Sequence, residues 1–521
     1  MFQKVLCLCL LTIITQTDSA RILVIIPTPA ISHQSALRPL WTELSLRGHS
    51  VTLATTNVAN DSRLVNLTEI DMGDMYTNPL LLSLYKKMSL ASNFEVLHLI
   101  NKLCDTILDL QLSTHLKHLI RNESLFDVVI AEHVIVDQLA FADLYGCPKV
   151  LVSSFDVTSL IHSYVGNPSN PVAHPDFNLA LTSGKLSFKE RIVSFIYVQI
   201  YYAYKLLVSY PTRTNILKKH FGDKVRSSEE FYKDIDLLLL NVNPILNEPR
   251  PLGPNVITFG GAIHVSQSKP LPKDLQDFLD SATEGCVYFS LGSNTKSAFM
   301  GEKKIKIIME ALGELPYKVL WKFEDEGVAV PKNIKLVSWV PQQDVLRHPN
   351  IKVFVTQCGM QSLEEAVVNH VPMVMMPMYG DQEANAKRME LKGIAKIVPH
   401  KPLPDKESFK SAIIEVITNP SYKQNIIKIA ELLLDTPMTG VEKAVWWIEY
   451  VIRHKGAKHL RVTDVDVPFY QYYCLDVMAT LLLIVYVFVK IIGYAFRALK
   501  KLVYRNKNVD KNNNKGIKKN N

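Results

Sequence analysis

The stretch VFVTQCGMQSLEEA, residues 353–366, closes an apolar run of strand type and opens a helix across a polar turn. A helix N-terminus presents free backbone N–H groups and the positive end of the helix dipole. Gly359 allows close approach of an anion, while Gln357 and Ser362 can donate hydrogen bonds to it. Glu365, one turn into the helix, can accept hydrogen bonds from a ribose diol. These residue types predict a site for a nucleotide phosphate and its ribose.

A structural role explains part of the same pattern. Ser362 and Glu365 have the spacing of a capping box, which would need no ligand. Neither G-x-G-x-x-G nor G-x-x-x-x-G-K-[ST] occurs in the chain, so dinucleotide and P-loop sites of those types lack support.

A second candidate is His33, within TPAISHQSAL directly after the first apolar run. A histidine near its ordinary pKa can take a proton from a hydroxyl group, as a general base does. A loop or helix-capping role is the alternative for such a residue.

Alternating strands and helices must position these residues. The first half predicts strands at 21–26 and 51–55 around a helix that ends at Gly48, then strands at 126–131 and 149–154 around a helix near 139–145. This alternation indicates a parallel, doubly wound sheet. We place the N-terminal domain at 20–247.

A proline-rich segment, 248–273, is predicted to link this domain to a second α/β series at 274–445. The second series predicts strands at 286–293, 318–323, 334–340, 352–356 and 372–378. Two such sheets would face each other across a cleft, and open sheets of this kind bind ligands beyond their strand C-termini. A C-terminal helix and juxtamembrane segment are predicted at 446–473.

Both chain ends predict targeting to a membrane system. Residues 1–19 have the charged, apolar and small-residue order of a secretory signal, and 474–496 are long and apolar enough for one transmembrane helix. The tail, 497–521, has nine basic residues and Asp510, a balance of +8 that equals the net charge of the chain. The rest is therefore near neutral, which argues against nucleic acid and places the tail in the cytoplasm.

Further signals agree with a lumenal location. Lys518 and Lys519, fourth and third from the end, resemble a dilysine signal for return to the endoplasmic reticulum; a solvated charged tail is the alternative. Glycosylation sequons begin at Asn60, Asn66 and Asn122. The cysteines lack metal-site or disulfide-framework spacing.

The segment 188–210 is apolar but interrupted by Gln199 and Lys205. We predict a core helix there. The alternative is an amphipathic helix lying against the membrane.

The run from Trp339 to Asn385 resembles the signature segment of UDP-glycosyltransferases. It has a Trp-x-Pro-Gln opening, a His-Pro pair, a Thr-x-x-Gly turn, a Glu-Ala pair, x-Pro-Met-Val and a closing Asp-Gln-x-x-Asn. The resemblance continues through RILVIIP, LRGHSVT, KPLPKDLQDFLDSA and VYFSLGSN to the tail, and Gln357 makes it most similar to invertebrate and baculoviral members.

The resemblance implies a GT-B fold, in which two Rossmann-like domains face a cleft. It implies a donor site in which Trp339 stacks on uracil, Gln342 contacts the uracil edge and Glu365 binds ribose. It further implies diphosphate contacts from Ser293, Gln357, Gly359 and Ser362, and sugar contacts from Asp381 and Gln382. Gln361 is also expected in the donor site.

The resemblance also makes His33 the catalytic base. Its acidic partner, an Asp in most of the family, is here Glu132, and Asp137 is an alternative partner. Many members have His where this chain has Gln357, which can donate a hydrogen bond but brings no positive charge.

We therefore predict an inverting enzyme that transfers a hexose, with glucose expected, from a UDP-sugar to a hydroxyl of a small lipophilic acceptor, without a metal or other cofactor. It would be a single-pass type I protein of the endoplasmic reticulum membrane with lumenal catalytic domains, and a homo-oligomer is open. Two alternatives remain: a membrane-tethered binding protein for hydrophobic ligands, or a glycosyltransferase acting on a lipid or sterol.

Overall fold

The structure is a computed structural model that describes residues 19–90, 93–121, 125–181, 186–293, 297–324, 329–378, 380–402 and 405–517. The chain divides into two units, residues 1–462 and 463–521, and each is described by itself. Nearly all of the predicted signal, the sequon at 122–124, and both Lys518 and Lys519 lie outside the described residues.

The N-terminal domain is built on a parallel sheet of seven described strands in the order β3-β2-β1-β4-β5-β6-β7. Its strand β1 pairs with β2 on one side and β4 on the other. The predicted doubly wound sheet is therefore confirmed. The strands are β1 (Arg21–Ile26), β2 (Ser50–Thr55), β3 (Leu67–Asp71), β4 (Val128–Glu132), β5 (Lys149–Ser153), β6 (Leu237–Leu240) and β7 (Val256–Thr258).

Nine described α-helices accompany this sheet. They are α2 (Ile31–Leu46), α3 (Pro79–Leu90), α4 (Asn93–Ser113), α5 (Lys117–Arg121), α6 (Ala140–Tyr145), α7 (Ser159–Tyr164), α8 (Phe188–Tyr204), α9 (Tyr210–Phe221) and α10 (Ser228–Lys233).

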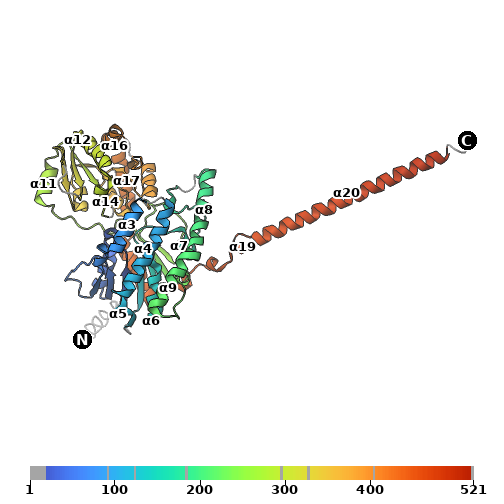
Figure 1. The fold of residues 1–521 in the computed structure, drawn as a ribbon, viewed down its shortest axis with the longest axis horizontal. Coiled ribbons are helices and arrows are strands. Elements are labelled where there is room, and N and C mark those ends of the chain that lie inside the picture. The colour runs from blue at the N-terminus through green and yellow to red at the C-terminus, as the bar shows by residue number, and fades with distance from the viewer. Residues whose placement is uncertain are drawn as a thin grey trace, which may run out of the picture. The chain divides into compact units, whose positions relative to one another are not determined.

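The C-terminal domain has a second parallel sheet, with six described strands in the order β10-β9-β8-β11-β12-β13. Helices α11, α12, α16 and α17 surround it (Figure 1). The strands are β8 (Cys286–Ser290), β9 (Lys318–Lys322), β10 (Ile334–Val337), β11 (Ile351–Thr356), β12 (Met373–Met375) and β13 (Ala395–Ile397). The helices are α11 (Lys273–Asp280), α12 (Glu302–Gly313), α13 (Gln342–Leu346), α14 (Met360–Val368), α15 (Gln382–Leu391), α16 (Lys406–Thr418), α17 (Pro420–Leu434) and α18 (Gly440–Arg453).

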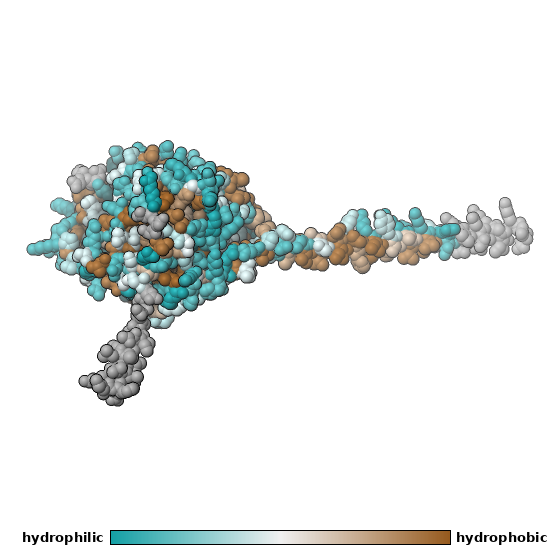
Figure 2. Space-filling model, turned by 90° about the horizontal axis from the view of Figure 1, so that it is seen from below, coloured by the Kyte–Doolittle hydropathy of each residue, from teal (hydrophilic) through white to brown (hydrophobic). Residues whose placement is uncertain are grey.

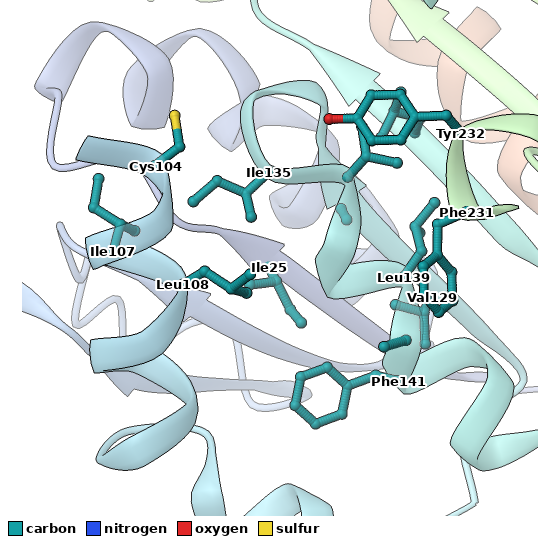
Figure 3. Close-up of a cluster of buried hydrophobic side chains, with 14 of the residues drawn as sticks. Ile25, Cys104, Ile107, Leu108, Val129, Ile135, Leu139, Phe141, Phe231 and Tyr232 are labelled. Atoms are coloured by element: carbon teal, nitrogen blue, oxygen red, sulfur yellow. The ribbon is translucent and has the colours of Figure 1, made fainter. Parts of the chain in front are cut away.

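Apolar side chains cover both faces of each sheet, as parallel sheets require. Along β1, Leu23 and Ile25 point into one buried cluster, while Val24 points into another. Figure 3 shows Ile25 and Ile107, from β1 and α4, in the first cluster. Each fully buried side chain of this kind contributes about 1.5–3 kcal/mol. The strand ends that carry the polar candidate residues are thereby held by a packed core.

Two segments outside the predicted range 20–247 pack on the N-terminal sheet. Strand β7, which lies inside the predicted linker 248–273, pairs in parallel with β6. Helix α18 begins at a capping box of Thr439 and Glu442, and its buried Val445 and Ile448 belong to a cluster of the N-terminal sheet. The chain thus leaves the N-terminal domain after β7 and returns to it in α18.

The prediction of a core helix at 188–210 is wrong. Within α8, Ser194 is the buried residue, and apolar side chains at its surface include Phe188, Phe195 and Ile196, which are 71%, 52% and 47% exposed. Apolar composition alone could not decide between core and surface. The alternative prediction, a surface helix with an apolar face, agrees with this exposure, and α8 runs along the side of the N-terminal domain (Figure 1).

The second unit contains α19 (Phe469–Tyr472) and α20 (Leu475–Ile517). The part of α20 from Leu475 to Asn506 is long and apolar enough to cross a membrane. The segment Phe188–Phe221 also passes this test, which depends on length and composition alone. Figure 2 shows apolar side chains along α20, followed by hydrophilic ones toward its C-terminal end.

Candidate active site

His33 lies in the first turn of α2, directly after the loop that follows β1. The buried side chain of Gln34 pins this loop, because its Nε2 donates to the backbone oxygens of Ile26 and Thr28 at 3.1 and 3.0 Å. The side chain of His33 is 16% exposed. The backbone beside His33 is therefore held in place, and part of its imidazole ring remains open to solvent.

Glu132 holds the other side of the imidazole. Its Oε1 lies 2.5 Å from His33 Nδ1, and its Oε2 accepts a 2.7 Å hydrogen bond from the Thr28 hydroxyl. Neighbouring strands β1 and β4 end at the same edge of the sheet, which brings the two residues together across 99 positions of sequence. Since Nδ1 faces the carboxylate, the tautomer assigned from this bond leaves Nε2 as the proton acceptor.

The two pKa values move apart in the way a base and its carboxylate partner need. Burial lowers the pKa of His33, but the charge and hydrogen bond of Glu132 outweigh it, so the pKa is raised above 6.5. Burial raises the pKa of Glu132, but the charge and hydrogen bond of His33 outweigh it, so that pKa is lowered. The pair is therefore stabilised with a charged glutamate.

Asp137, the alternative partner, does not contact His33, which corrects that hypothesis. It is fully buried and lies 3.0 Å from the guanidinium of Arg213, while the Ser228 hydroxyl donates to its other oxygen. The kinked 3-10 segment His133–Leu139 directs it away from the strand end. Asp137 thus has a structural ion pair.

A short turn joins the end of β11 to the start of α14, as the sequence predicts. Cys358 has a φ of 73° and Gly359 is the N-cap, with no side chain bonded to the helix end. A Cβ atom on Gly292 would lie 2.1 Å from Gln357 Nε2, so this side chain fits only beside a glycine. Gln357 therefore reaches the loop after β8, where Ser293 lies.

A second group of polar residues surrounds the first turns of α14. Gln342 Nε2 donates to the Ser362 hydroxyl at 2.9 Å and to Glu365 Oε2 at 2.6 Å, and its Oε1 accepts from the Tyr288 hydroxyl at 2.9 Å. The structure thus places Gln342 against the predicted phosphate and ribose residues. Trp339 is 58% exposed, which leaves its ring available for stacking.

Three residues of this group were not predicted from the sequence. Gln343 Nε2 donates to Glu365 Oε1 at 3.1 Å, His264 Nε2 lies 3.3 Å from the same atom, and Lys322 Nζ lies 5.6 Å from the Trp339 ring centre. The doubled glutamine at 342–343 was a usable signal. No local pattern marked the other two, because they come from distant segments.

The predicted sugar-binding pair stands at the N-terminus of α15. Asp381 Oδ2 accepts from Asn385 Nδ2 at 2.7 Å, and Gln382 Oε1 accepts from the Met378 backbone N–H at 2.9 Å. Burial raises the pKa of Asp381; the hydrogen bond from Asn385 and, more weakly, the charge of His33 act in the opposite direction.

Direct hydrogen bonds join the two domains. Gln361 Nε2 donates to the Ser154 backbone oxygen at 3.0 Å, and Lys387 Nζ donates to the Ala180 backbone oxygen at 2.7 Å. Gln361, predicted as a donor-site residue, thus bonds the N-terminal domain in this structure. Within the described part of the chain, no group of three His, Cys, Asp or Glu side chains could hold a metal ion.

This geometry combines a histidine–glutamate pair on one domain with a helix start free of a side-chain cap and a carboxyl-amide pair on the other. A family profile described as "UDP-glucoronosyl and UDP-glucosyl transferase" matches residues 20–509. The chain belongs to the UDP-glycosyltransferase family. Its two-sheet architecture is the GT-B fold, and its activity class is that of a UDP-glycosyltransferase.

Relatives of known type support this membership over most of the chain. The chain is 31% identical to "UDP-glucosyltransferase 2" of Dactylopius coccus over 95% of its length and 96% of the relative. It is 34% identical to human "UDP-glucuronosyltransferase 2B7" over 70% of its length and 68% of the relative. A viral "Ecdysteroid UDP-glucosyltransferase", from Spodoptera littoralis nuclear polyhedrosis virus, is 29% identical over 91% of the chain and 96% of the relative.

Solved structures confirm the fold. A glycosyltransferase of kitacinnamycin matches 83% of the chain and 98% of its own with a TM-score of 0.57 at 18% identity. The enzyme Os79 of O. sativa, solved in complex with U2F and trichothecene, matches 82% of the chain and all of its own with a TM-score of 0.56 at 17% identity.

Proposed function

We propose that this UDP-glycosyltransferase moves a hexose, with glucose as the first candidate, from a UDP-sugar to a hydroxyl of a small lipophilic acceptor, with inversion at the anomeric carbon. The observation that carries the proposal is the His33–Glu132 pair, because it supplies a positioned base on the domain opposite the donor residues. An acceptor hydroxyl at Nε2 would lose its proton as its oxygen attacks the sugar carbon. The charge that forms on the imidazole would face Glu132.

The donor side would stabilise the departing UDP without chemistry of its own. Backbone N–H groups at the start of α14 and the amide of Gln357 would face the diphosphate, where negative charge grows as the glycosidic bond breaks. Trp339 offers an exposed ring for uracil. Glu365, held by Gln342 and Gln343, would accept from the ribose hydroxyls.

Glucose is favoured by the names of two relatives, a UDP-glucosyltransferase of an insect and an ecdysteroid UDP-glucosyltransferase of an insect virus. The second name also supports a steroid among the acceptors to test. The family membership and the His33–Glu132 pair disfavour the alternative of a binding protein without catalysis.

We further propose that α20 anchors the chain in the endoplasmic reticulum membrane, with the catalytic domains lumenal. The basic residues after the apolar part of α20 support this orientation. Asn60 and Asn66, both exposed, are available as glycosylation sites. The exposed apolar face of α8 is a separate candidate for contact with a lipid surface.

The test is transfer by purified full-length protein from UDP-glucose, UDP-glucuronate, UDP-galactose and UDP-N-acetylglucosamine to phenol, flavonoid and steroid acceptors. Mass spectrometry of the products should show addition of one hexose, greatest with UDP-glucose, together with an equal amount of UDP. A matched preparation of His33→Ala should bind UDP and give little product. Binding of these acceptors without transfer from any donor would overturn the proposal in favour of a binding protein.

A further inference from the structure

A buried histidine lies between two adjacent carboxylates of α14. His264 Nδ1 is 3.5 Å from Glu364 Oε2, and its Nε2 is 3.3 Å from Glu365 Oε1. The side chains of the three residues are 2%, 1% and 9% exposed. Water therefore has little access to the two glutamates, and His264 is the cation placed to face both.

The three residues join the segment between the domains to the donor site. His264 follows β7 and precedes α11, and its backbone oxygen accepts from Gln343 Nε2 at 3.2 Å. Glu364 accepts from backbone N–H groups of Gly261 and Ala262 in the same segment. Glu365 instead faces the two glutamine amides of α13. The carboxylates therefore have different partners, although they are neighbours in sequence.

A buried carboxylate with no partner of opposite charge holds its proton more tightly, so its pKa rises. Burial dominates at Glu364 and raises its pKa. At Glu365 burial also acts to raise the pKa, but the adjacent imidazole of His264, followed by the bonds of the two glutamines, outweighs it, so the pKa of Glu365 is lowered. Burial lowers the pKa of His264, and the two glutamates reverse this and raise it above 6.5.

We propose that His264 is a positioning residue of the donor site: its imidazolium, beside Glu365, keeps that carboxylate negatively charged, so that Glu365 can accept hydrogen bonds from ribose. This inference rests on the proposed function, because it takes Glu365 as the ribose-binding residue. His264 itself would touch no part of the donor.

Other titratable groups near this triad are already bonded elsewhere. From β8, Tyr288 directs its hydroxyl to Gln342. On α13, Asp344 Oδ1 accepts from the Lys269 backbone N–H at 2.9 Å, and Arg347 donates to the Ser266 backbone oxygen. A pH response of ribose recognition would therefore originate in His264 and the two glutamates.

The sign of that response follows from the direction of each shift. In the wild type the pKa of Glu365 is depressed, so its charge persists between pH 7.5 and 5.5 and donor affinity should be flat. In His264→Gln no cation opposes the effect of burial on Glu365, and the pKa of Glu365 should rise above its usual value. Affinity should then be lost as pH falls through the raised value, by about tenfold for each pH unit below it.

The experiment measures binding of UDP-glucose and of its 2′-deoxyuridine analogue to the detergent-solubilised full chain by calorimetry at pH 7.5 and 5.5. Neither ligand titrates in this range. We expect the wild type to bind UDP-glucose more tightly than the 2′-deoxyuridine analogue, by about the same factor at both pH values. We expect Glu365→Gln to lose this preference at both pH values. We expect His264→Gln to keep much of the preference at pH 7.5 and to lose about tenfold of it at pH 5.5.

The variant Glu364→Gln is a matched control, because it changes a neighbouring buried carboxylate and leaves His264 beside Glu365. Its preference should be as insensitive to pH as that of the wild type, whereas a loss caused only by altered packing would appear in both variants. Thermal melting at both pH values checks that each variant is folded. A preference in His264→Gln as insensitive to pH as in the wild type would overturn the inference. Absence of any preference in the wild type would instead overturn the assignment of Glu365 to ribose.

Discussion

Replacing Glu132 by Gln removes the charge that faces the proposed base and keeps a side chain of similar size. Glu132 is fully buried and lies 2.5 Å from His33 Nδ1. A hydrogen bond to a charged group contributes about 1.5–3 kcal/mol, and each 1.36 kcal/mol is a factor of ten in rate. Because this charge stabilises the imidazolium that forms during transfer, kcat/KM should fall about 10- to 100-fold. His33→Ala, which removes the base itself, should cost about 10²–10⁴.

The pH profile tests the reason for this loss. The base must be deprotonated, and the charge and hydrogen bond of Glu132 together raise the pKa of His33 against the effect of burial. Wild-type kcat/KM should therefore rise with pH through a value above 6.5. In Glu132→Gln the burial effect is no longer opposed, so this limb should move to lower pH. The assay is kcat/KM from pH 5.5 to 8.5 with an aliphatic alcohol as acceptor.

Two controls sharpen the comparison. An acidic phenol that is already ionised at the assay pH should lose much less rate in His33→Ala, because its proton has gone. Asp137→Asn breaks the buried pair with Arg213 and should lower thermal stability, on the order of 3–5 kcal/mol, without moving the acid limb. An unchanged acid limb in folded Glu132→Gln would refute the coupling of the two residues.

Five further outcomes are expected. Trp339→Ala should weaken UDP binding by about 1–3 kcal/mol, measured by calorimetry, since base stacking on an aromatic ring is of that size; unchanged affinity would contradict the uracil site. Gly292→Ala, at a φ of 81° and 2.1 Å from Gln357 Nε2, should displace that amide and weaken UDP binding, whereas Gly301→Ala, where a Cβ meets nothing within 4 Å, tests backbone strain alone. Chelation with EDTA should leave the transfer rate unchanged, and a loss restored by Mg²⁺ would show a metal requirement. Protease added to intact microsomes should remove only the tail after 496, and a lipid bearing an acyl-chain photolabel should mark α8 peptides but not exposed Leu432 and Leu434 of α17.

Much of the fold and part of the site could be predicted because they depend on local pattern. The β1 and β11 strands follow from continuous apolar runs that end in polar turns. A parallel sheet then brings the ends of β1 and β4 together, which places Glu132 beside His33. The choice between Glu132 and Asp137 needed the kink after β4, and no local pattern shows that kink.

The remaining features depend on paths through space. His264 reaches α14 from a segment about 100 residues earlier, because the chain between β7 and α11 passes beside that helix. The surface position of α8 could not be predicted, since a buried helix and a membrane-facing helix have the same apolar composition. Strand β7, three residues long within a proline-rich segment, is too short to give a period.

The central claim is that His33 activates an acceptor hydroxyl for direct displacement of UDP from the sugar. Proton NMR of the first glucoside formed from UDP-α-glucose by the full-length protein tests it most directly. The large anomeric coupling of a β-glucoside, formed with one equivalent of UDP and nearly absent with His33→Ala, is the expected result. An α-glucoside, or a β-glucoside formed at the wild-type rate by His33→Ala from an aliphatic alcohol, would contradict it.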